Sequence, residues 1–282
     1  MTRLSLVWLM LAALAASALI HVAGELFAAP GQADPYVRPA FARSMERLRP
    51  AILAAAARHN RPEISHMTDR EFAVVVALLL YNEHFGWLED EVPPLRALTP
   101  LYQAAQVDIN RLGGNLSVWP SNLRPSVALE ILRQEVPVRG GVLVRPVRVA
   151  GSRLNLAALP DERARNAAIT AEITRPELAV EYLAANLERG LYRAQHEGVA
   201  VTWQVLAAWH NQGIVAPADI RANPTARDYI RRTEAYLPTA QRLILGHEDI
   251  RVPHPPFGLV RGSQGERSPP WPSPYRRMPV VL

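Results

Sequence analysis

Glu83 is the residue of this sequence whose position best suits acid and base chemistry. It lies at the end of an apolar run in the stretch FAVVVALLLYNEHFG. In a helix, Glu83 shares one stripe with Val76 and Leu79, and other apolar residues cover the remaining directions, so we expect it at the rim of the core. Burial and the negative end of the helix dipole both disfavour a charged carboxylate there. A carboxylic acid that stays neutral near pH 7 is what a general acid requires.

The same position also fits a solvated or arginine-paired residue at a helix end, and position alone leaves both roles open. The three acids that follow, Glu89, Asp90 and Glu91, are interpreted as a solvated loop. No other acidic residue lies in the stretches YNEHFG, SVWPSNLRP and AAWHNQG. If these stretches form one cleft, Glu83 is therefore expected to be its only carboxylate.

Two later stretches carry side chains suited to binding a sugar chain. In GGNLSVWPSN, the indole of Trp119 offers an apolar face, and Ser117 and Asn122 offer polar groups. Such a mixture suits a groove that binds a polar chain with apolar sugar faces, although Trp119 could equally pack on the core. In LAAWHNQGI, His210 and Asn211 are either buried structural residues or partners of Glu83 and the substrate.

Together these three stretches resemble the lysozyme-like lytic transglycosylases over about residues 68–213. In that family a helix ends at the catalytic Glu, a Gly-Leu-Met-Gln loop leads into a Pro-started helix, and a later helix carries Ala-Tyr-Asn-Ala-Gly. Glu83 takes the place of the catalytic acid and Asn122 that of the loop Gln. His210 and Asn211 take the places of Tyr and Asn. The loop itself reads VWPSN, and His210 stands where the family has Tyr.

The resemblance implies a fold, a substrate and a mechanism. The fold would be mainly α, a lysozyme-like helical domain, to which the sequence adds a small β-hairpin insertion. The substrate would be the glycan strands of peptidoglycan, cut between N-acetylmuramic acid and N-acetylglucosamine with formation of a 1,6-anhydro end. Substrate contacts are expected from Ser117, Trp119, Asn122, His210 and Asn211. No metal and no organic cofactor is implied.

Two rival functions remain open on the same fold. The altered VWPSN loop favours a non-catalytic protein that binds peptidoglycan or acts as a scaffold. A hydrolytic lysozyme would need a second carboxylate across the cleft, for which Asp108 and Asp161 are the weak candidates.

The composition excludes several classes of protein and site. The chain of 282 residues has no cysteine, so disulfides and thiolate metal sites are excluded. Its eight histidines are scattered without a metal-ligand spacing. The 31 basic residues are all arginines and give a net charge of +5, which favours an acidic partner. Nucleic acid is not expected, because no helix-turn-helix, finger or aromatic-plus-basic pattern occurs.

The sequence predicts one domain with appendages at both ends. Residues 1–23 contain the apolar run 4–20 after Arg3 and predict either a cleaved export signal or a short anchor in the cytoplasmic membrane. Residues 24–38 are interpreted as a linker, 39–246 as the lysozyme-like domain, and 247–282 as a Pro-rich, extended or disordered tail whose partners are unknown. The domain is accordingly expected outside the cytoplasmic membrane, in the periplasm or cell envelope.

Capping patterns and periodicity predict the helices of the domain. Thr68 and Glu71 have capping-box spacing before a helix that closes at Gly86, and Thr174 and Glu177 have the same spacing before a long amphipathic helix. Valine alternation predicts the hairpin within 140–156. Further helices are expected at 41–60, 100–112, 124–134, 202–209, 216–222 and 224–245.

Overall fold

The fold is mainly helical and has one small antiparallel sheet, as predicted. A computed structural model describes residues 35–213, 220 and 222–246, and these belong to one compact unit. Its elements are α2 (Pro39–His59), α3 (Pro62–Ser65), α4 (Asp69–Glu83), α5 (Gly86–Glu91), α6 (Leu95–Arg111), α7 (Pro125–Leu132), β1 (Glu135–Val138), β2 (Gly141–Val144), η1 (Leu156–Ala158), α8 (Glu162–Ile173), α9 (Pro176–Glu197), α10 (Trp203–Gln212), α12 (Pro224–Ala235) and α13 (Leu237–Leu245).

Several predictions concern residues beyond this range. The predicted export signal or anchor at 1–23, most of the linker and the tail at 247–282 lie outside the described residues, as does most of the helix expected at 216–222. Within the described part of the chain, no helix is both long and apolar enough to cross a membrane.

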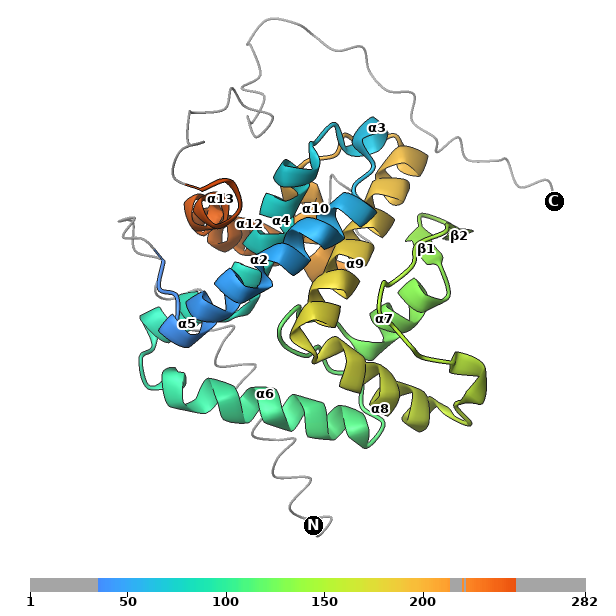
Figure 1. Cartoon of the computed structure of the whole chain (residues 1–282), viewed down its shortest axis with the longest axis horizontal. Coiled ribbons are helices and arrows are strands. Elements are labelled where there is room, and N and C mark those ends of the chain that lie inside the picture. The colour runs from blue at the N-terminus through green and yellow to red at the C-terminus, as the bar shows by residue number, and fades with distance from the viewer. Residues whose placement is uncertain (1–34, 214–219, 221, 247–282) are drawn as a thin grey trace, which may run out of the picture. The chain divides into compact units, whose positions relative to one another are not determined.

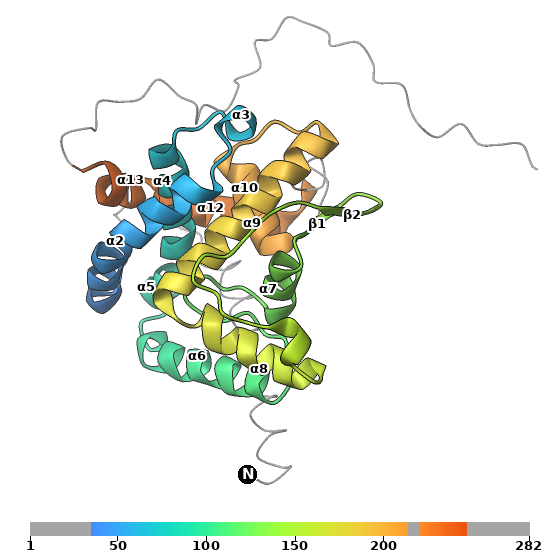
Figure 2. The same ribbon diagram turned by 45° about the vertical axis from the view of Figure 1, so that its right-hand side comes forward.

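Helix α4 forms the centre of the core. The Thr68 hydroxyl accepts from the Glu71 N–H at 3.2 Å while the Glu71 carboxylate accepts from the Thr68 N–H at 2.7 Å, which confirms the predicted capping box. Every residue from Phe72 to Glu83 is buried, because α2, α9, α12 and α13 pack around this helix. Figures 1 and 2 show α4 enclosed by these helices, with α6 and α8 together at the end of the unit away from α3.

The end of α4 differs from the prediction. The helix ends at Glu83, Phe85 has a positive φ of 62°, and Gly86 starts α5 instead of capping α4. A Cβ on Gly86 would lie 2.2 Å from the His84 ring and 2.2 Å from the Tyr36 carbonyl oxygen, so close packing explains this glycine. The solvated loop predicted for residues 89–91 is a helical segment of α5, in which Asp90 and Glu91 are exposed as predicted. For Glu89 the prediction is wrong, because this residue is buried and its Oε2 lies 3.2 Å from the Arg38 Nε.

Other helix and strand boundaries also differ from the prediction, because tertiary packing decides them. Thr174 caps the end of α8, and α9 begins at Pro176, so the second predicted capping box is wrong. The helix expected over 224–245 is two helices that meet at Tyr236. The predicted hairpin is present, but β1 begins at Glu135, before the valine-rich stretch. It flanks α9 together with α7.

Candidate active site

Glu83 is a buried carboxylate surrounded by polar groups from three other parts of the chain. Its side chain is 4% exposed. Oε1 accepts a short hydrogen bond from the Tyr229 hydroxyl of α12, and Oε2 accepts one of 2.8 Å from the Asn122 amide. The Nε2 of His210, on α10, lies 3.6 Å from Oε1. Among the described residues, no Arg contacts Glu83, so the carboxylate is held by neutral donors and one imidazole.

The loop before α7 holds Asn122 in a fixed position. The Val118 N–H donates to the Leu123 carbonyl oxygen at 2.9 Å and closes the loop. Asn122 has a positive φ of 52°, a conformation that asparagine adopts more readily than most residues. The closed loop therefore directs the Asn122 amide at Glu83.

His210 is oriented by a polar residue on α9. Thr202 caps α10 by accepting from the Val205 N–H, and the helix carries the imidazole towards Glu83. The Asn186 amide nitrogen lies 3.4 Å from the His210 Nδ1. An amide nitrogen can only donate, so Nδ1 accepts in this arrangement and Nε2 carries the ring hydrogen on the side of Glu83.

Tyr229 is the partner of Glu83 that the sequence did not indicate. It is 2% exposed, and burial together with the nearby Glu83 charge raises its pKa well above the usual value. Both effects favour the protonated phenol, which donates to Glu83 in this structure. In the sequence this tyrosine is one apolar position of an amphipathic helix, and nothing there distinguishes it from a core residue.

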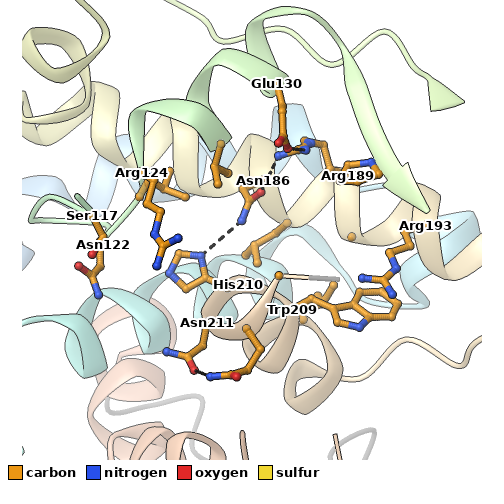
Figure 3. A pocket seen from close by; sticks show the side chains of 18 of the residues that line it. Ser117, Asn122, Arg124, Glu130, Asn186, Arg189, Arg193, Trp209, His210 and Asn211 are labelled. Atoms are coloured by element: carbon orange, nitrogen blue, oxygen red, sulfur yellow. Dashed lines mark hydrogen bonds and ion pairs between the residues drawn. The ribbon is translucent and has the colours of Figure 1, made fainter. Parts of the chain in front are cut away.

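A cavity of about 480 Å³ opens beside Glu83, within the size range typical of ligand sites. Its walls include Ser117, Asn122, His210 and Asn211 (Figure 3). Four of the five residues predicted to contact substrate therefore share one cavity with Glu83. Trp119 is not among the lining residues. Its ring packs edge-on against Phe41 at 6.2 Å, in agreement with the alternative that it belongs to the core.

Several charged residues that the sequence did not single out also line the cavity. Glu130, from α7, is a second carboxylate, so the expectation that Glu83 is the only acid in the cleft is wrong. It lies beyond the end of the loop motif, one and a half turns into α7, and its place became evident only from helix packing. Arg189 binds Glu130 at 2.5 Å, and Arg124 and Arg193 complete the charged lining.

The two acids predicted for a hydrolase lie elsewhere. Asp108 is largely exposed and pairs with Arg111 at 3.0 Å on the same helix. Asp161 caps α8 by accepting from the Ala164 N–H at 2.7 Å. Neither lines the cavity.

Neither metal ligation nor similarity to known proteins identifies the chemistry of this site. No cluster of three or more His, Asp or Glu residues able to hold a metal ion occurs in the described part of the chain. Comparison of the sequence with protein families and curated proteins, and of the fold with solved structures, finds no match. The site is therefore described by its own geometry, a buried carboxyl group that lines a cavity.

Proposed function

We propose that this chain is a peptidoglycan lytic transglycosylase with a lysozyme-like helical domain. The observation that supports this most strongly is the hydrogen bond from Asn122 to Glu83 in a cavity that His210 also lines. Each of these residues comes from one of the three stretches that resemble the family. Their convergence on one carboxylate is what the resemblance implies and what unrelated core residues would not require.

In the proposed reaction, Glu83 acts first as an acid and then as a base. Neutral Glu83 donates its proton to the oxygen that links muramic acid to the next sugar, and the bond from this oxygen to the anomeric carbon breaks through an oxocarbenium-like transition state. The Glu83 carboxylate then accepts the proton of the muramyl 6-hydroxyl as that oxygen bonds to the anomeric carbon. The products are an anhydro-muramyl end and a free hydroxyl, and Glu83 is again neutral.

The neighbours of Glu83 suit both halves of this cycle. No arginine pairs with Glu83 among the described residues, and the Tyr229 and Asn122 donors stabilise the carboxylate that forms after proton transfer. Both donors are fixed before the reaction, so the charge appears in a site already organised for it. His210 limits the movement of the carboxyl group from the side of α10.

Glu130 favours a second candidate function, hydrolysis. A glycosidase of this kind uses two carboxylates, one of which activates water or attacks the sugar. Glu130 lines the same cavity, where it is held in an ion pair with Arg189. The two functions differ in whether water enters the product.

Product mass after digestion of purified sacculi in isotopically labelled water distinguishes these functions. The proposal predicts muramyl ends that are one water lighter than reducing ends and carry no label. Labelled reducing ends alone would show hydrolysis and contradict the proposal, and a chain that binds sacculi without cleaving them would show the non-catalytic role. The proposal also requires export of the domain, which a fused phosphatase that is active only outside the cytoplasm would report.

A further inference from the structure

Arg124 is the one cavity arginine without a protein partner among the described residues. Arg189 is bound to Glu130 at 2.5 Å, and the Nε of Arg193 donates to Glu197 at 3.0 Å. The Arg124 guanidinium makes no such hydrogen bond or ion pair, and the residue is exposed. Within the described part of the chain, the cavity therefore presents one exposed arginine that no other residue pairs with.

The position of Arg124 is fixed relative to Glu83. It follows Asn122 by two residues, immediately before Pro125 starts α7, and the closed loop between Val118 and Leu123 holds this segment. Figure 3 shows the Arg124 side chain extending into the cavity on the side of His210. Because Arg124 and Glu83 line the same cavity, a sugar chain that fills the cavity can contact both.

A guanidinium at such a place favours a carboxylate, which it can bind through two parallel hydrogen bonds. Each muramyl residue of peptidoglycan carries a lactyl group, whose carboxylate is free in peptide-free glycan. In peptide-bearing glycan this group is amide-linked to a stem peptide that has carboxylates of its own. Glycans built only of N-acetylglucosamine carry no such charge.

We propose that Arg124 binds a carboxylate of the muramyl substituent and thereby makes the site select muramyl glycan over uncharged glycan. This inference rests on the proposed function, because that function supplies the substrate. It adds a specificity-determining residue that the loop resemblance does not include. The two arginines that are already paired with Glu130 and Glu197 are not expected to contribute in this way.

Binding to an inactive chain tests this inference without relying on turnover. In the Glu83→Gln background, calorimetry would measure the Kd of a peptide-bearing muramyl tetrasaccharide, of its peptide-free form and of chitotetraose. Arg124→Gln is expected to weaken muramyl binding roughly 10- to 100-fold and to leave chitotetraose within about twofold. Arg124→Lys should retain part of the affinity, because the charge remains while the paired geometry is lost. Arg133→Gln is the matched control, since Arg133 is exposed at the other end of α7 and does not line the cavity.

The source of the carboxylate follows from which ligand loses affinity. A loss with the peptide-free tetrasaccharide identifies the lactyl group, and a loss only with the peptide-bearing one identifies the stem peptide. Unchanged muramyl affinity in Arg124→Gln, or an equal loss for chitotetraose, would overturn the inference and leave the proposed function standing. Failure of the Glu83→Gln chain to bind any of the three glycans would overturn both.

Discussion

Two buried sites on opposite faces of α9 differ in whether arginine side chains compensate the charge of their glutamates. On one face of α9, Glu181 and Glu188 flank His59 of α2, whose Nε2 and Nδ1 lie 2.9 and 2.7 Å from their oxygens. Arg58 also binds Glu181, at 3.0 Å through its Nε, and Arg61 binds Glu188. On the other face, Asn186 orients His210 towards Glu83, which has no arginine partner among the described residues.

The first group, which we call the balanced group, consists of Glu181, Glu188 and His59 with Arg58 and Arg61, and its hydrogen bonds shift the pKa values of His59 and Glu181 in opposite directions. Burial lowers the pKa of His59, but its hydrogen bonds to Glu181 and Glu188 outweigh this and raise it overall. Burial raises the pKa of Glu181, but the bonds from His59 and Arg58 outweigh it and lower the pKa to about 2. A carboxylate held in this way cannot donate a proton near pH 7. The comparison teaches that burial alone does not distinguish a catalytic carboxylate from a structural one, and that the two groups differ in whether an arginine compensates the acid.

The largest expected effect is on catalysis at Glu83, which has no arginine partner among the described residues. Glu83→Gln removes the carboxyl group that first donates and then accepts a proton in the proposed reaction, so cleavage of purified sacculi should fall by about 1000-fold, in the range typical of a lost general acid. Asp108→Asn is the control, because Asp108 is exposed and outside the cavity. Activity of Glu83→Gln within a few-fold of the wild type would remove Glu83 from the catalytic role.

A smaller effect is expected from the donor that supports Glu83. Tyr229→Phe removes one hydrogen bond to the carboxylate and keeps the ring packing, so activity should fall roughly 10-fold, which corresponds to the lower end of the range of about 1.5 to 3 kcal/mol for a hydrogen bond to a charged group. The alkaline limb of the pH–rate profile should move to higher pH, because the carboxylate is less stabilised. Tyr102→Phe, outside the cavity, should change neither quantity. An unshifted profile in Tyr229→Phe would indicate that the tyrosine serves only packing.

The balanced group should give the smallest effect, a pH dependence of the free energy of unfolding. Glu181 has a lowered folded pKa, so its contribution is complete above about pH 4.5 and is lost as the pH falls towards about 2. His59 has a raised folded pKa, so its contribution is complete below about pH 6.5 and is lost as the pH rises through the folded value. Urea unfolding should therefore show the greatest contribution between these limits. A His59→Gln variant that keeps the full alkaline decline would exclude His59 as its source.

The sequence was most informative where local patterns decide the structure. The capping box at Thr68 and the apolar run to Glu83 predicted the start of α4 and the burial of its acid. The partners of Glu83 were only partly predictable, because Asn122 belongs to a loop motif whereas Tyr229 reaches the site through the packing of α12 on α4. Glu130 was missed for the same reason: its contact with Arg189 joins residues that are 59 positions apart.

The loss of stability on neutralising each acid tests the contrast between the two groups most directly. Glu188→Gln leaves the buried His59 and Arg61 with less compensation, so the free energy of unfolding should fall by about 3 kcal/mol, as for other broken buried ion pairs. Glu83→Gln should leave it within about 1 kcal/mol of the wild type or raise it, because the amide can accept from Asn122 and donate to the Tyr229 oxygen without a buried charge. Urea unfolding of the two variants at pH 6 would measure both values. A loss in Glu83→Gln as large as that in Glu188→Gln would contradict the account, because it would show that Glu83 is also a charge-balanced structural residue.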